Sequence, residues 1–191
     1  MSPAPDCLEV LPDSSRDSEI CIRCGFCCDG TLFNYGAAGL TETAETLINI
    51  GVSPLTDDHG SVRGFRQPCP HFAEKCSIYS SPRPSVCGAF RCRLLRLVDK
   101  GKYTADQAQQ IVADTRSLRE VVLPELDRLE EAVGGVNSLR NEQSLLGRIT
   151  ELLPSLIRGA GAEFGQEPGR SAKAAMTLFL NLRRYFVRLR Q

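Results

Sequence analysis

The cysteines of this 191-residue chain are concentrated in its first half. Eight of the nine lie between Cys21 and Cys92, and none follows Cys92. Thiolate sulfur is a soft ligand that favours zinc, copper(I) and iron–sulfur clusters. Outside a secreted disulfide-rich chain, clustered cysteines indicate metal or redox chemistry rather than a disulfide framework. The cysteine-rich segment therefore predicts a metal-binding module.

The first four cysteines fall within eight positions, in the stretch CIRCGFCC. Cys21, Cys24 and Cys27 follow one another at the Cys-x-x-Cys spacing, which lets neighbouring sulfurs converge on one metal. This run matches the first three ligands of a bacterial ferredoxin, but Thr31 stands where the fourth cysteine would be. Cys69, which is followed by a proline, is an alternative fourth ligand.

The next feature is the adjacent pair Cys27-Cys28. Neighbouring side chains rarely face the same small ion, so the pair predicts either two different sites or one site and one free redox thiol. Four more cysteines return later in the segment: Cys69, Cys76, Cys87 and Cys92. Eight sulfurs suit two tetrahedral Cys₄ sites, or one cluster with spare thiols. Zinc and an iron–sulfur cluster both remain open at this point.

Other polar residues lie between these cysteines. Arg83 and Arg91 could offset the negative charge of metal-bound thiolates, or they could be solvated or paired with carboxylates. Tyr79 is expected to pack rather than to act as an acid. His71, two residues after Cys69, is an additional candidate ligand, whereas His59 is expected to be exposed in a turn.

The distribution of cysteine, glycine and proline divides the chain into three parts. Residues 1–19 are acidic and rich in Pro and Ser, and we expect a mobile leader. Residues 20–102 form the cysteine-rich module and residues 103–191 a helical extension. The predicted fold class is α+β: a small cysteine-rich metal-binding module with short strands, followed by an α-helical extension.

Within the module the pattern predicts short elements. Thr41 is the expected N-cap of a helix that Gly51 ends. A turn is expected near His59 and Gly60, and Gly101 ends the last helix of the module. The predicted elements are strands within 31–36 and 57–65 and helices over 41–51 and 85–100.

The extension shows apolar residues at helical spacing. Thr104 and Gln107 form a capping box at its start, and Pro124 either kinks the first helix or starts a new one. That helical stretch should end near Gly134 and Gly135. Further helices are predicted over 138–153 and 170–190.

Composition limits the classes of partner. The formal net charge is zero, so the whole chain does not carry the basic excess of a nucleic-acid-binding protein. No segment reaches the roughly 18 uninterrupted apolar residues of a transmembrane helix, and the N-terminus lacks the pattern of a signal peptide. We therefore expect a cytoplasmic protein, with a protein partner bound through the helical extension and an oligomeric state that the sequence does not give.

The segments CIRCGFCC, PCPHF and CSIYSSPRPSVCGAFRC together resemble the cysteine-cluster family named for its C-x-x-C-x-x-C-C motif. The resemblance covers roughly residues 20–97. Members of that family are described as zinc- or iron-chelating, some are labelled iron–sulfur oxidoreductases, and flagellin lysine N-methylase looks like a larger relative. The resemblance implies that all eight module cysteines are metal ligands. It also marks Tyr79 and Arg83 as cofactor-binding candidates.

Two positions depart from the family pattern. Three residues, SSP, separate Tyr79 from Arg83 where the family usually has two, and Gly88 follows Cys87 where arginine is common. The first departure leaves the placement of Arg83 for the structure to decide.

Three functions follow from these observations. The first is a cytoplasmic protein whose cysteines coordinate zinc or an iron–sulfur cluster in a redox or metal-handling role. The second is an enzyme of the lysine-methylating or oxidoreductase type. The third is a structural zinc module that presents its helices to a partner. No set of nucleophile, base and orienting group can be assembled, so the sequence assigns no catalytic residue and does not decide whether the protein is an enzyme.

Overall fold

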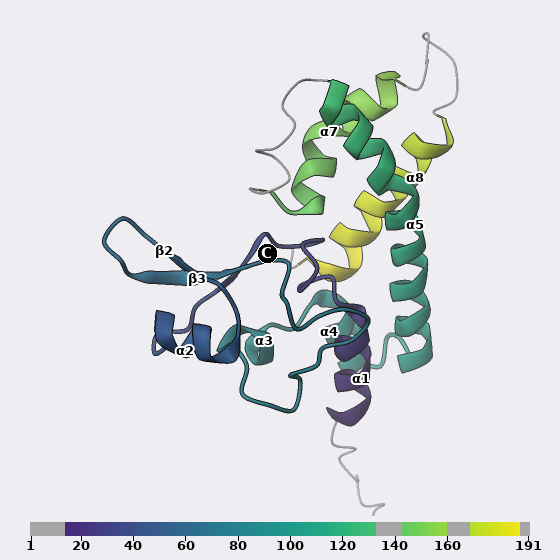
Figure 1. Cartoon of the computed structure of the whole chain (residues 1–191). Helices are drawn as coiled ribbons and strands as arrows, with labels where there is room; N and C mark the ends of the chain where they lie inside the picture. The colour runs from purple at the N-terminus through teal and green to yellow at the C-terminus, as the bar shows by residue number, and fades with distance from the viewer. Residues whose placement is uncertain (1–13, 133–142, 160–168, 188–191) are drawn as a thin grey trace, which may run out of the picture.

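The computed structural model describes residues 14–132, 143–159 and 169–187. A small sheet and short helices lie on one side of the molecule, and long helices lie on the other (Figure 1). Helix α1 (Ser14–Cys24) leads into the first cysteine cluster. The predicted α+β class is confirmed.

The sheet has three short antiparallel strands in the order β1-β3-β2. They are β1 (Tyr35–Ala37), β2 (Pro54–Thr56) and β3 (Val62–Arg66). The predicted turn is confirmed, because the Asp57 carboxylate accepts hydrogen bonds from the backbone N–H groups of His59 and Ser61. The first strand begins later than predicted, since Thr31 and Leu32 belong to a loop in which the Leu32 N–H bonds to Phe26.

Helix α2 (Ala44–Ile50) begins at Thr43, so the prediction of Thr41 as N-cap was wrong. The Thr43 hydroxyl accepts from the N–H of Thr46, and the Thr46 hydroxyl accepts from the N–H of Thr43. This reciprocal pair satisfies two N–H groups that would otherwise have no partner. Gly51 ends the helix as predicted, with φ of 88°.

The predicted continuous helix over 85–100 was wrong. Two helices, α3 (Ser85–Ala89) and α4 (Arg93–Asp99), are separated by extended backbone at Phe90 and Cys92. The break lets Cys87 pack toward the small sheet while Cys92 is buried among the long helices.

Three long helices form the extension: α5 (Ala105–Ala132), α7 (Leu145–Gly159) and α8 (Arg170–Asn181), which continues as the π-helical segment η1 (Leu182–Phe186). The capping box of Thr104 and Gln107 is confirmed by both of its hydrogen bonds. Pro124 lies within α5 and does not start a new helix. Cys7, the predicted helix end at Gly134 and Gly135, and the outer ends of the two predicted C-terminal helices lie outside the described residues.

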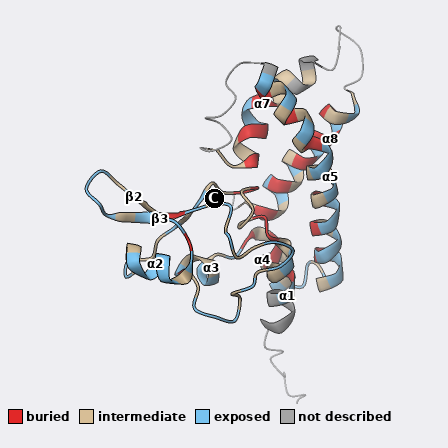
Figure 2. Ribbon diagram, in the orientation of Figure 1, coloured by how far each residue is buried: buried red, intermediate tan, exposed pale blue. Residues whose placement is uncertain are grey.

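Two hydrophobic cores stabilise the fold. The large core joins the first cysteine cluster to the long helices, as the buried segments of Figure 2 indicate. The small core consists of Leu47, Val52 and Phe65, between α2 and the sheet. The cysteine-rich segment therefore rests partly on the extension, because the core that it does not share with the long helices has three buried residues.

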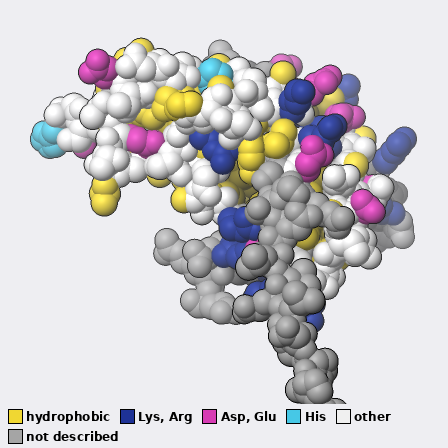
Figure 3. Space-filling view, turned by 90° about the horizontal axis from the view of Figure 1, so that it is seen from below, with side chains coloured by type: hydrophobic (Ala, Val, Ile, Leu, Met, Phe, Trp, Pro, Cys, Tyr) yellow, Lys and Arg dark blue, Asp and Glu magenta, His cyan; other side chains and the backbone are white. Residues whose placement is uncertain are grey.

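No helix in the described part of the chain is long and apolar enough to cross a membrane. On the face shown in Figure 3, Lys and Arg side chains lie beside Asp and Glu side chains toward the right of the view. This mixing agrees with the zero net charge of the sequence.

Candidate metal centre

The loop that follows α1 is fixed by its glycine and its phenylalanine. Gly25 has φ of 71°, and a Cβ atom there would overlap the ring of Phe72. Phe26 is buried in the large core, with its ring edge-on to Phe186 at a centroid distance of 4.9 Å. The Cys28 N–H then donates to the Gly25 carbonyl over 2.6 Å. Gly25 and Phe26, which lie between the second and third cysteines, thus fix the position of this loop.

Backbone hydrogen bonds bring the later cysteines to this loop. The Cys69 N–H donates to the Cys28 carbonyl over 2.6 Å, and the Cys76 N–H donates to the Ile22 carbonyl over 3.0 Å. Backbone hydrogen bonds thus join residues more than 40 positions apart without help from a metal.

The cysteines divide between the two cores. Cys92 is buried in the large core and three others pack against it; we call these four the core cysteines: Cys21, Cys24, Cys27 and Cys92. Cys69 and Cys87 pack against the small core. Together with Cys28 and Cys76, which belong to neither core, they are the outer cysteines. All eight are free thiols.

The charged neighbours of the outer cysteines are mostly other outer cysteines, which agrees with this grouping. Burial raises the pKa of the Cys28 thiol, and negative charge on Cys69 and Cys87 raises it further. Burial raises the pKa of Cys87 to about 11, with Cys69 its first charged neighbour. Cys76 contributes to the raised pKa of all three. Negative charge on neighbouring outer sulfurs therefore opposes the ionisation of Cys28, Cys69 and Cys87.

The core cysteines interact in the same way. Burial raises the pKa of Cys24, and among charged groups Cys92 and Cys21 contribute most. Burial raises the pKa of Cys27 strongly, with Cys24 as its first charged neighbour and Cys28 as its second. Cys21 also has Cys76 as a neighbour, so it lies between the two groups. A cation placed within each group would offset this repulsion, because its positive charge stabilises the thiolates that coordinate it.

Backbone N–H groups are directed at several of these sulfurs. Burial raises the pKa of each thiol concerned, and the N–H groups oppose the rise: Phe26 at Cys24, His71 at Cys69, and Leu95 and Leu94 at Cys92. Hydrogen bonds to the charged form stabilise a thiolate, and such outer-shell donors support metal ligands. The donor set therefore fits a soft metal ion such as zinc or iron.

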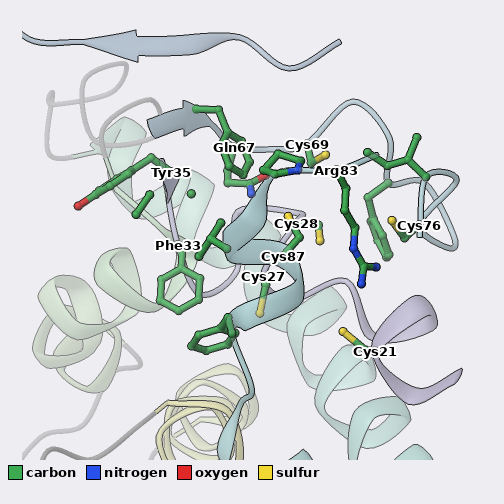
Figure 4. Close-up of a pocket in the computed structure, with 18 of the residues that line it drawn as sticks. Cys21, Cys27, Cys28, Phe33, Tyr35, Gln67, Cys69, Cys76, Arg83 and Cys87 are labelled. Carbon is green, nitrogen blue, oxygen red and sulfur yellow. The ribbon is translucent and has the colours of Figure 1, made fainter. Parts of the chain in front are cut away.

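A cavity of about 360 Å³ opens beside the outer cysteines (Figure 4). Six of the eight cysteines line it, the exceptions being Cys24 and Cys92. Among the described residues, no three His, Cys, Asp or Glu side chains form a preformed ligand set. The sulfurs must therefore move together to share an ion, as is usual where metal binding and folding are coupled.

The polar candidates have distinct positions. Arg83 lies over the Tyr79 ring, with its guanidinium carbon 3.9 Å from the centroid, and its charge lowers the pKa of Cys21 and Cys87 against the larger effect of burial. Arg91 pairs with the Asp99 carboxylate at 2.7 Å. His71 has Nε2 2.6 Å from the carbonyl oxygen of Ile50.

These contacts separate the candidates. Arg91 pairs with a carboxylate, which is one of the alternatives that the sequence left open for this residue. His71 uses one ring nitrogen on the backbone of α2, and His59 is exposed at its turn. Tyr79 packs against Arg83 at the cavity wall.

Sequence reasoning missed two arginines of α5 that hold the first cysteine loop. Arg116 donates from one terminal nitrogen to the carbonyls of Arg23, at 2.6 Å, and Cys24, at 3.0 Å. Arg119 lies 3.8 Å from the carboxylate of Asp29 at the other end of the loop. Both belong to a helix that carries no cysteine, so only their spacing of three residues along α5 could have indicated a shared role.

Replacement of Arg116 by alanine should weaken metal retention. The change removes the two charge-assisted hydrogen bonds that Arg116 donates to the backbone carbonyls of Arg23 and Cys24. The loss of such an outer-shell contact typically lowers metal affinity roughly 10–100-fold. The measurement is metal transfer to a chelator at equilibrium. Arg116→Lys, which keeps the charge, should be intermediate, and Arg128→Ala on the same helix is the control. Equal retention in Arg116→Ala and Arg128→Ala would contradict this role.

Comparison with family models assigns the cysteine-rich region. Residues 20–113, just under half of the chain, match the model CxxCxxCC, described as a "putative zinc- or iron-chelating domain". The match includes all eight cysteines of the module and the first residues of α5. No curated protein and no solved structure matches the chain. Residues 20–113 of this protein are thus similar to the CxxCxxCC family, whose model carries that zinc- or iron-chelating description.

Proposed function

We propose that the eight cysteines bind zinc or iron in two separate four-thiolate sites. The core cysteines would form one site and the outer cysteines the other. The observation that carries this proposal is the packing of the four core cysteines in the large core, whereas Cys69 and Cys87 of the outer group pack against the small core. The order of electrostatic neighbours supports it, since Cys27 has Cys24 as its first neighbour while Cys28 has Cys69. Cys27 and Cys28 would thus serve different metals.

The two sites would have different roles. The core site lies among the long helices, and two of its sulfurs do not reach the cavity. All four outer cysteines line the cavity, so a metal there could exchange, react or transfer electrons. We therefore propose a structural core site and an outer site for redox or metal handling, with Arg83 offsetting part of the thiolate charge. Thiolate ligands require reducing conditions, which supports a compartment such as the cytoplasm.

The adjacent pair gives a matched test of the two-site arrangement. Cys27→Ser and Cys28→Ser change neighbouring positions by the same single atom. After anaerobic purification, metal analysis should give each variant one occupied site fewer than the natural protein, and the double variant two fewer. Cys27→Ser should also melt at a clearly lower temperature than Cys28→Ser, because its site lies in the large core.

A visible spectrum of the same samples identifies the metal. Broad absorption with iron and labile sulfide would indicate a cluster, and a colourless protein with bound zinc would exclude electron transfer. Loss of all metal in either single variant would show one shared site and would refute the two-site proposal.

A further inference from the structure

The cavity beside the outer cysteines has a second half that metal ligation does not use. In Figure 4, Phe33 and Tyr35 lie on the opposite side of Cys28 from Arg83. The wall on that side comes from β1, β3, the segments flanking them and the end of α3. Its rings are those of Phe33, Tyr35, Phe65 and Phe90. The whole cavity, at about 360 Å³, is within the roughly 300–1,000 Å³ range of small-molecule sites.

The aromatic wall is held in place by its own packing. Phe33 and Phe90 meet edge to face with their centroids 5.3 Å apart. Phe65 is 1% exposed in the small core, and its ring lies so close to Gly36 that a Cβ atom there would overlap it. A wall fixed in this way loses little side-chain entropy when a flat ligand contacts it.

One polar atom in this wall has no partner. The side-chain oxygen of Gln67 is buried and accepts no hydrogen bond within the described part of the protein. A buried acceptor left unsatisfied is costly, so a turn of the Gln67 amide that brings this oxygen to an N–H or O–H group of a ligand in the cavity would be favourable.

Charge limits the ligand further. Metal-bound thiolates next to the cavity would repel an anion, and the Arg83 guanidinium at the same cavity would repel a cation. Since the two charges are opposite and offset each other, the cavity does not require a charged ligand, and its apolar rings suit an uncharged molecule.

From these features we propose that the aromatic half of the cavity binds a small, flat, uncharged molecule that donates one hydrogen bond to Gln67. The site is formed by Phe33, Phe65, Phe90 and Gln67. Its place beside a metal rests on the two-site function proposed above, whereas the aromatic wall and the acceptor do not.

Indole and N-methylindole test this proposal, because both are flat and uncharged but only indole carries an N–H donor. The chain contains no tryptophan, so the fluorescence of the added probe can be followed directly in titrations of the metal-loaded full-length protein. Indole should bind more tightly than N-methylindole by roughly fivefold, the effect of one net hydrogen bond.

Variants assign the preference to the site. Gln67→Leu should remove the preference for indole and leave N-methylindole binding unchanged, while Phe33→Ala should weaken both probes. Leu40→Ala is the control, since Leu40 is fully exposed and does not line the cavity.

Equal binding of the two probes to the natural protein, or binding of neither, would overturn the proposal without use of any variant. Metal analysis of the same samples separates this result from a failure of the two-site function. If the proposed metal sites do not exist, metal analysis will find no bound metal, whether or not the probes bind.

Discussion

Removal of the metal should unfold much of the cysteine-rich segment. The part of the segment that contains the sheet and α2 has a separate small core of three buried residues, Leu47, Val52 and Phe65. Structural zinc sites supply apparent binding free energies of about 10–16 kcal/mol, which is comparable with the whole stability of a typical domain, about 5–15 kcal/mol. Without metal, the buried thiols also lack the cation that would hold them together. We therefore expect loss of ordered structure around the sheet and α3.

Limited proteolysis and circular dichroism of chelated and metal-loaded protein provide the measurement. Cleavage should concentrate within residues 20–102, and the helices of the large core should be the more resistant part. Return of the metal under reducing conditions should restore protection. Equal melting temperatures and cleavage patterns with and without metal would show that the segment folds independently of it.

Replacement of Arg148 by methionine should destabilise the helical extension by about 3–5 kcal/mol, because it takes away the cation that pairs with a buried carboxylate. Glu130 is 1% exposed, and its two oxygens accept from Arg148 Nε at 2.6 Å and from a terminal nitrogen at 2.9 Å. Asp127 accepts from the same terminal nitrogen at 2.8 Å. Burial opposes the charge of Arg148, but the hydrogen bonds that Arg148 donates to Glu130 and Asp127 outweigh it and raise the pKa of the guanidinium.

Urea denaturation of the metal-loaded protein measures this effect. The double variant Glu130→Leu with Arg148→Met should regain most of the lost stability, since a buried ion pair can often be replaced by apolar residues. Arg128→Ala is the matched control: its partner is Glu125 on the same helix, its side chain is 71% exposed, and the expected loss is about 1 kcal/mol or less. A loss in Arg148→Met no larger than in this control would contradict a stabilising role for the buried pair.

Much of the local structure could be predicted because it depends on neighbouring residues. The capping box of Thr104 and Gln107 and the helix end at Gly51 were confirmed, since each involves side chains or backbone within one turn. The choice of Thr41 over Thr43 failed within the same rules, because both threonines suit an N-cap and only the hydrogen bonds distinguish them.

Predictions that involve distant residues were less successful. Helical spacing across residues 85–100 indicated one helix, yet the chain opens so that Cys87 and Cys92 pack against different cores. The contacts of Arg116 with the first cysteine loop join segments 92 and 93 positions apart, and no local pattern records such a contact.

The sequence by itself determined that this protein has a cysteine-rich module suited to zinc or iron, because sulfur chemistry and Cys-x-x-Cys spacing are local properties. The family match agrees with that prediction. Only the tertiary structure separates the sulfurs into core and outer groups and creates the cavity beside them, because these depend on which distant segments pack together. For Cys27 and Cys28, adjacency in the chain posed the question of two sites or one, and their burial against different surroundings supports two.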